Sequence, residues 1–272
     1  MRDELIIVSG QRDIYRRILS PQNGDNIATL ATFLDRFDMS TVHPLLLHLA
    51  EIGMGAGEWR EVAALIESYL CRRAVCGLSV KNYTRMFLNL TRRLRDDGAS
   101  ASNIRQYLSE LSGDGFVWPS DARFKSEWRG ADIYARLSNR KLVHFLLRLS
   151  DTYNSSKTES IVIVSPLTIE HIMPQAWTKY WPMDDGSLGL SDDQLDDMSD
   201  VPHNSTASRQ RSQLTQTLGN LTIVTQELNT AVSNGPWHEK KPALLAASLL
   251  PINLQLATID AWNEGSIATR SE

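Results

Sequence analysis

Glu170 and His171 are neighbours in the sequence, and Pro174 follows three residues after the histidine. A carboxylate beside an imidazole suits metal-assisted hydrolysis, because the carboxylate can hold a hard cation while the imidazole takes a proton from water. On a strand the two side chains would point to opposite faces, and the proline would end the strand pairing. An isolated histidine is more often structural, so the pair needs partners before it indicates a site.

Two asparagines downstream are candidates for those partners. Asn220 lies in the string Leu-Gly-Asn-Leu-Thr that begins at Leu218, and Asn229 follows nine residues after it. Glu170 together with the Asn229 amide oxygen would suit Mg²⁺, which binds few carboxylates and completes its octahedron with phosphate and water. Taken singly, the first asparagine is as typical of a turn and the second of a helix cap. Their combination with the Glu-His pair favours a catalytic site.

The elements that must position these residues are two strands and a helix. Residues 161–164 and 167–170 have the β-branched and apolar composition of strands, and residues 220–224 predict another. A helix is predicted to begin near Gln226. Residues 181–213 are polar and rich in Asp, Ser and Gly, which predicts a long loop. The order strand, loop, strand, helix predicts a ββα unit that a long insert interrupts.

The remaining sequence predicts helices, because apolar residues recur at three- and four-residue spacing. Ser100 and Ser120 are expected to cap two of them, and Gly77 to end another. We therefore predict a mainly α fold with a small α+β part, divided into residues 1–157 and 158–272. The predicted helices cover residues 27–34, 42–52, 58–78, 79–95, 100–111, 131–149, 243–250 and 252–262.

The motifs of the last third resemble those of a known family. They are Glu-His-Ile-Met-Pro-Gln from Glu170, Leu-Gly-Asn-Leu-Thr, Leu-Asn ending at Asn229, Ser-Asn ending at Asn234, and a lysine at Lys241. In this order and spacing they resemble the C-terminal nuclease domain of GmrSD-type modification-dependent restriction endonucleases, an HNH (ββα-metal) nuclease. The helical region is also similar to the segment that precedes this nuclease, notably at 43–47 and 69–78. The first motif acid is Glu where many HNH proteins have Asp.

The resemblance implies roles for individual residues. His171 would be the general base, and Asn220 would bond the backbone across the loop so that the imidazole is oriented. Glu170 and Asn229 would hold Mg²⁺ or Mn²⁺. The possible further site residues are Gln175, Asn234 and Lys241, with Lys240 as a further contact to DNA phosphates.

The implied function is that of a metal-dependent DNA endonuclease, nicking or cutting both strands. It would be the effector part of a bacterial anti-phage, modification-dependent restriction system. Relatives carry an N-terminal nucleotide-hydrolysing sensor with an Asp-Gly-Gln-Gln-Arg signature, which this sequence lacks, so we expect that sensor as a separate domain or subunit. The alternative is a non-catalytic helical DNA- or protein-binding module with an inactive HNH-like unit.

The charge distribution bears on DNA binding. The net charge of −4 is not that of a dedicated nucleic-acid binder. Residues 58–160 nevertheless carry 17 Lys and Arg against 12 Asp and Glu, whereas residues 161–272 carry 6 against 13. Arg72 and Arg73 in the basic region are candidate phosphate contacts, although a solvated or salt-bridged helix face is the commoner explanation.

The expected location is the cytoplasm, without a membrane partner. The 272-residue chain contains no apolar run of membrane-spanning length, and its first residues lack the features of a signal peptide. Cys71 and Cys76 match neither a zinc nor a redox motif, which favours reduced, partly buried side chains.

Overall fold

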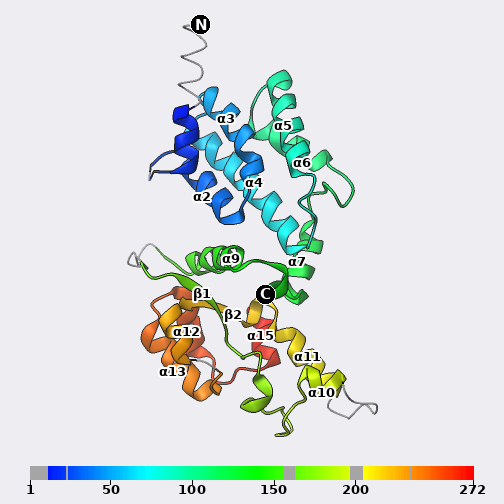
Figure 1. Cartoon of the computed structure of the whole chain (residues 1–272), viewed down its shortest axis with the longest axis vertical. Coiled ribbons are helices and arrows are strands. Elements are labelled where there is room, and N and C mark those ends of the chain that lie inside the picture. Colours follow the sequence, from blue (N-terminus) through cyan, green and yellow to red (C-terminus); the bar gives the residue numbers. More distant parts are fainter. Residues whose placement is uncertain (1–11, 23, 156–162, 197–204, 233) are drawn as a thin grey trace. The chain divides into compact units, whose positions relative to one another are not determined.

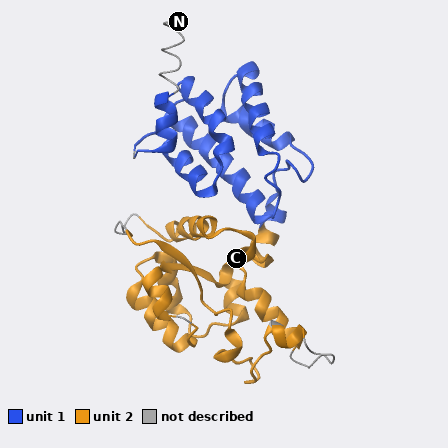
Figure 2. Cartoon of the chain, in the orientation of Figure 1, with its two compact units in different colours: residues 1–124 blue, residues 125–272 orange. Residues whose placement is uncertain are grey.

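The computed structural model describes residues 12–22, 24–155, 163–196, 205–232 and 234–272 (Figure 1). The chain forms two compact units, residues 1–124 and residues 125–272 (Figure 2). The boundary between the units, after residue 124, lies earlier in the chain than the boundary predicted after residue 157. Helix α9 (Asn139–Thr152) consequently belongs to the second unit, where it packs against the strands.

The described part of the first unit is built from helices. α4 packs against α2 and α6, and α5 packs against α3 and α6. The apolar face predicted for α4 is buried, with Val62, Ile66 and Tyr69 at 0% exposure. Gly77 follows the helix with a positive φ of 65°, as expected of a helix stop. The elements are α2 (Ala28–Phe37), a 3-10 turn (Ser40–Val42), α3 (His43–Glu51), α4 (Ala56–Val75), α5 (Tyr83–Asp97) and α6 (Ala101–Glu110).

Both predicted helix caps are confirmed. The Ser100 hydroxyl accepts a hydrogen bond from the Asn103 backbone N–H at 3.1 Å, at the start of α6. The Ser120 hydroxyl accepts one from the Arg123 N–H at 3.3 Å, at the start of α7 (Asp121–Gly130), which crosses the boundary between the units. Each bond satisfies an N–H that has no partner within its helix.

The second unit contains the strands, which pair as a two-stranded antiparallel sheet. The register joins Leu167 of β1 to Thr225 of β2, and His171 to Leu221. The elements are α8 (Ile133–Arg136), β1 (Leu167–His171), a 3-10 turn (Trp177–Lys179), α10 (Asp192–Asp196), α11 (Ser205–Thr215), a 3-10 turn (Leu218–Asn220), β2 (Leu221–Thr225), α12 (Gln226–Val232), α13 (Trp237–Ala247), α14 (Pro251–Leu254), a 3-10 turn (Gln255–Thr258) and α15 (Glu264–Arg270).

Helices cover the small sheet. α9 and α12 each pack against both strands, and Figure 1 shows them on opposite sides of the pair. A two-stranded sheet alone is marginal in water, so this helical packing stabilises it. The order β1, β2, α12 agrees with the strand, strand, helix order expected from the sequence.

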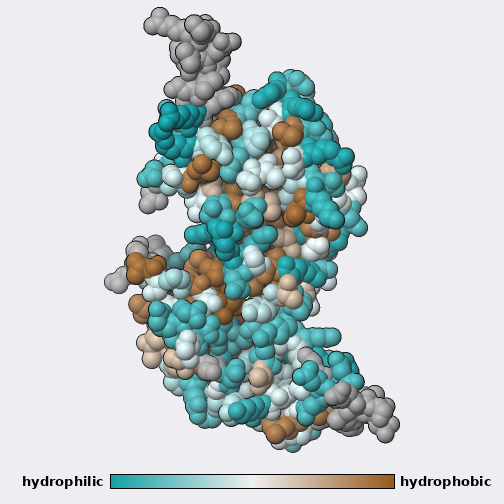
Figure 3. Space-filling model, in the orientation of Figure 1, coloured by the Kyte–Doolittle hydropathy of each residue, from teal (hydrophilic) through white to brown (hydrophobic). Residues whose placement is uncertain are grey.

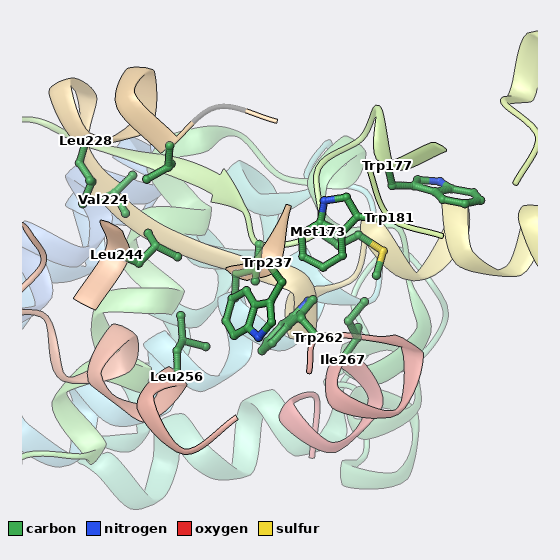
Figure 4. Packing of buried hydrophobic residues seen from close by; sticks show 12 residues of the cluster. Met173, Trp177, Trp181, Val224, Leu228, Trp237, Leu244, Leu256, Trp262 and Ile267 are labelled. Carbon is green, nitrogen blue, oxygen red and sulfur yellow. The ribbon is translucent and has the colours of Figure 1, made fainter. Parts of the chain in front are cut away.

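A tryptophan-rich core lies next to the end of β1. The rings of Trp181 and Trp237 have centroids 6.5 Å apart, and those of Trp237 and Trp262 are 5.4 Å apart (Figure 4). Ile172 and Met173, directly after β1, belong to the same core and are 0% and 1% exposed. Each tryptophan buries a large area, so the chain that leaves β1 is firmly anchored.

Several further sequence expectations differ from the structure. The single helix predicted at 131–149 is divided into α8 and α9, and in the helix predicted at 252–262 the helical structure ends at Thr258. The insert at 181–213 is not a continuous loop, because α10 and most of α11 lie within it, and α11 packs against α15. Of the strand predicted at 161–164, residues 161 and 162 lie outside the described residues, and Val164 is non-strand and 91% exposed. Asn220 ends a 3-10 turn immediately before β2 and does not begin the strand itself.

Among the described residues, every helix is too short or too polar to span a lipid bilayer. Over the face shown in Figure 3, hydrophilic residues predominate on both units.

Candidate active site

Glu170 and His171 are the last two residues of strand β1 and lie at the end of the sheet. Beyond His171 the backbone N–H of Ile172 donates to the Asn220 carbonyl at 2.9 Å, so the chain stays attached to the turn before β2. Here lies a cavity of about 350 Å³. Its lining residues are Glu170, His171, Pro174, Gln175, Asn229, Thr230 and Asn234.

The cavity therefore unites residues from separate parts of the sequence. Glu170 and His171 come from β1, Asn229 comes from α12, and Asn234 follows that helix. Asn229 is half-buried, and its side-chain Nδ2 donates a hydrogen bond to the Ile169 carbonyl at 3.1 Å. This bond links α12 to β1 and leaves the amide oxygen as the atom that offers lone pairs to a ligand.

The Glu170 carboxylate is almost completely buried, at 7% exposure. It forms an ion pair with the Nζ of Lys240 on α13, and the same Nζ donates to the His171 carbonyl at 2.6 Å. Burial raises the pKa of Glu170, and the nearby Lys240 ammonium offsets part of that rise. Lys240 is itself only 1% exposed, so the expectation that it contacts DNA is not supported. Instead it provides a buried positive charge in contact with Glu170 and the His171 carbonyl.

The His171 ring is held by contacts from two sides. Its Nε2 lies 3.3 Å from the amide oxygen of Gln216, and the Tyr134 ring meets it edge-on with centroids 4.5 Å apart. Burial lowers the pKa of His171 to about 4, and the Lys240 charge adds to this lowering, whereas Gln216 and Asp132 oppose it. The imidazole is thus uncharged at neutral pH and keeps one nitrogen lone pair.

Asn220 does not line the cavity and is 0% exposed. Its Oδ1 accepts from the Met173 N–H at 2.8 Å and from the Trp262 indole N–H at 3.0 Å. Its Nδ2 donates to the carbonyls of Met173 at 2.8 Å and Thr215 at 2.9 Å. One amide therefore joins the chain leaving β1, the end of α11 and the tryptophan core.

Gly219 allows the turn before β2 to approach the last helix closely. A Cβ at this position would lie 2.2 Å from the Ile267 carbonyl oxygen and 2.2 Å from the Ser271 hydroxyl. The Arg270 guanidinium reinforces the contact by donating to the carbonyls of Gly219 and Leu221, both at 2.7 Å. α15 thereby fixes the turn that carries Asn220.

Comparison with known proteins identifies the family of the chain. The family model described as "GmrSD restriction endonucleases, C-terminal domain" matches residues 118–272. The chain belongs to this family. The chain matches no curated protein and no solved structure.

The matched range contains all of the second compact unit, and with it every residue of the candidate site. The GmrSD resemblance read from the motifs is therefore confirmed. The similarity expected at residues 43–47 and 69–78 lies outside the matched range and stays a prediction.

Two further residues expected at the GmrSD site lie in different surroundings. Gln175 is exposed, lines the cavity and donates to the Gln216 amide oxygen at 3.3 Å. Lys241 does not line the cavity, because its Nζ donates to the Ile259 carbonyl at 2.8 Å. The phosphate contact expected of Lys241 is accordingly not supported.

Arg72 and Arg73 stabilise the first unit. Arg73 is 0% exposed and donates to the carbonyls of Val117 and Ser79, each at 2.8 Å. Arg72 pairs with Asp121 at 2.6 Å. A fully buried guanidinium cannot meet a DNA phosphate in this structure, so the expected phosphate contact of Arg73 is not supported. That of Arg72, whose guanidinium is already paired, stays an expectation without structural support.

Sequence reasoning missed three residues that surround the histidine. Tyr134, Gln216 and Lys240 contact the His171 ring or backbone, although none was expected to do so. Tyr134 and Gln216 have no motif partner in the sequence. The sequence indicated Lys240 only as a basic residue next to the motif lysine, Lys241.

Proposed function

We propose that this GmrSD C-terminal domain is a metal-dependent DNA endonuclease of the HNH type, with its active site in the cavity at the end of β1. The observation that carries the proposal is the cavity lining itself. A carboxylate, an uncharged imidazole and an amide meet around one space of about 350 Å³. Family membership supports DNA as the substrate, and the order β1, β2, α12 supports the ββα-metal arrangement.

His171 is the general base in this proposal. Its uncharged imidazole accepts a proton from the attacking water as the new bond to phosphorus forms. General-base catalysis contributes roughly 10²–10⁴ in rate, which corresponds to about 3–5.5 kcal/mol of barrier. Burial keeps the imidazole unprotonated at neutral pH, because it disfavours the charged form.

Glu170 and Asn229 are the proposed oxygen donors for Mg²⁺ or Mn²⁺. A bound divalent cation would neutralise charge on the phosphoryl oxygens and assist the leaving oxygen. The described residues contain no group of three or more His, Cys, Asp or Glu side chains suited to a metal. One carboxylate with one amide fits a cation that keeps most of its water and gains phosphate oxygens. Lys240 already pairs with Oε1 of this carboxylate, so in the proposal the cation is held by Oε2, against the repulsion of the ammonium.

Plasmid relaxation tests the catalytic proposal. We expect purified wild-type protein with Mg²⁺ or Mn²⁺ to nick supercoiled DNA, and His171→Ala to lose at least about 100-fold of that rate. His238→Ala is the matched control, because His238 has a side-chain exposure of 79% and does not line the cavity. Equal nicking by the wild type and His171→Ala would reject the assignment. Metal-independent DNA binding without cleavage would favour the non-catalytic module instead.

Thermal unfolding tests the cation site without requiring activity. A ligand at 100 times its dissociation constant stabilises the folded state by about 2.7 kcal/mol. We expect Mn²⁺ to raise the unfolding temperature of the wild type and to raise that of Asn229→Ala much less. An equal shift in both proteins would exclude Asn229 as a donor.

The biological setting is a further part of the proposal. The domain would be the effector of an anti-phage, modification-dependent system, controlled by a nucleotide-hydrolysing sensor domain or subunit. Adding such a sensor with nucleotide is expected to increase cleavage of phage DNA that carries modified bases over unmodified DNA. Equal cleavage of both DNAs would contradict this role.

A further inference from the structure

The amide oxygen of Gln216 lies between two nitrogens at the candidate site. The Nε2 of His171 and the Nε2 of Gln175 are each 3.3 Å from it. An amide oxygen can accept hydrogen bonds but cannot donate them. The His171 contact is therefore a hydrogen bond only if Nε2 carries the ring proton, which leaves the lone pair on Nδ1.

The backbone of Gln216 is also firmly positioned. Directly after α11, its carbonyl accepts from the N–H groups of Ile133 at 3.1 Å and Tyr134 at 3.2 Å. These bonds tie it to the start of α8, the helix that also supplies the Tyr134 ring against His171. The connection between α11 and β2 is thus held at the same place as the histidine ring.

The orientation of the Gln216 amide is set by its neighbours. Its Nε2 donates to the Thr215 hydroxyl at 3.4 Å. The Thr215 hydroxyl donates its own proton to the Ser212 carbonyl at 2.6 Å, so a rotated amide, with its oxygen toward Thr215, would lose this bond. The observed orientation keeps the acceptor oxygen toward His171.

We propose that Gln216 is a positioning residue that holds His171 as the Nε2-protonated tautomer, with Nδ1 free to act as the base. The role of Nδ1 rests on the proposed nuclease function, whereas the tautomer itself does not. A neutral imidazole can carry its proton on either nitrogen, and only one tautomer offers its lone pair in a given direction. The edge-on Tyr134 ring restricts rotation of the imidazole, and Gln216 selects which nitrogen is protonated.

Nitrogen NMR of ¹⁵N-histidine-labelled protein, without metal or DNA, tests the tautomer directly at pH 8. The chain contains six histidines, and the signals that disappear in His171→Ala identify those of His171. We expect wild-type His171 to be protonated at Nε2 alone. A wild-type ring protonated at Nδ1, or a mixture of both tautomers, would overturn the inference.

Three substitutions then test Gln216. Gln216→Met keeps the side-chain size but removes the acceptor, so we expect a mixture of tautomers. Gln216→Glu keeps an acceptor oxygen and should preserve Nε2 protonation, which separates hydrogen bonding from simple packing. Gln213→Met is the control, because Gln213 is exposed on α11, the helix that Gln216 directly follows. An unchanged His171 spectrum in Gln216→Met would overturn the inference.

Cleavage assays separate this inference from the proposed function. Loss of a hydrogen-bond partner that orients a histidine in a metal site typically costs roughly 10–100-fold. We expect Gln216→Met to lower kcat by a factor of this order without changing DNA binding. If the tautomer mixes but kcat is unchanged, Gln216 does not position the base. If the wild type does not cleave although its tautomer is as expected, the nuclease proposal fails and the tautomer assignment stands.

Discussion

Replacing Asn220 with alanine should destabilise the second unit more than any other single amide removal at the site. The substitution leaves two N–H groups, on Met173 and Trp262, without their acceptor, and two carbonyls, on Met173 and Thr215, without their donor. At about 1 kcal/mol net for each of the four bonds, the expected loss is about 4 kcal/mol. That is a large part of the roughly 5–15 kcal/mol by which folded domains are stable.

Denaturant unfolding followed by tryptophan fluorescence measures this loss, because the core beside Asn220 contains Trp262 and three further tryptophans. In a thermal scan the same loss would lower the midpoint by about 8–16 °C for a unit of this size. Asn229→Ala is the comparison, since the structure gives its side chain one hydrogen bond, and we expect a loss of about 1 kcal/mol. If the two alanine variants are equally stable, the four-bond role of Asn220 is refuted.

Two further substitutions test the supports of the site. Gly219→Ala is expected to lower the free energy of unfolding by roughly 1–3 kcal/mol, because its Cβ would meet the Ile267 carbonyl oxygen and the backbone must move. A denaturant midpoint equal to that of the wild type would contradict this. Burial alone would raise the pKa of Glu264, but hydrogen bonds from the Arg211 guanidinium at 2.5 and 3.0 Å outweigh it, so the folded-state pKa lies below the usual value. The unfolded chain then binds the proton first, and this stabilisation is present above the unfolded pKa and is lost as pH falls through the folded one. Glu264→Gln should therefore be less stable than the wild type at pH 7, and the difference in unfolding free energy between the two proteins should become smaller toward pH 3. If the difference between their denaturant midpoints stays constant over this range, the ion pair does not titrate.

Local patterns in the sequence were sufficient for the elements that carry the reactive groups. The apolar and β-branched residues before Glu170 favoured a strand, and β1 is there. The helix predicted from Gln226 is α12, which brings Asn229 to the cavity. Such predictions succeed because strand alternation and helix spacing are properties of neighbouring residues.

The polar insert shows where local patterns stop being informative. α11 has a polar sequence without a continuous apolar stripe, so composition favoured a loop. In the folded protein Arg211 of this helix is 2% exposed and pairs with Glu264 at the start of α15. This ion pair joins α11, a helix that the sequence did not predict, to α15.

The sequence alone determined the family and the strand that carries the Glu-His pair, and it predicted the two asparagines as partners of that pair. Only the tertiary structure decided that Lys240 lies under Glu170 and that Gln216 faces His171. It also decided that Arg73 is buried among carbonyls, whereas a basic cluster in a sequence looks the same whether solvent, protein or DNA surrounds it. The physical reason is that burial and pairing depend on residues distant in the chain, and these meet only when the helices pack around the sheet.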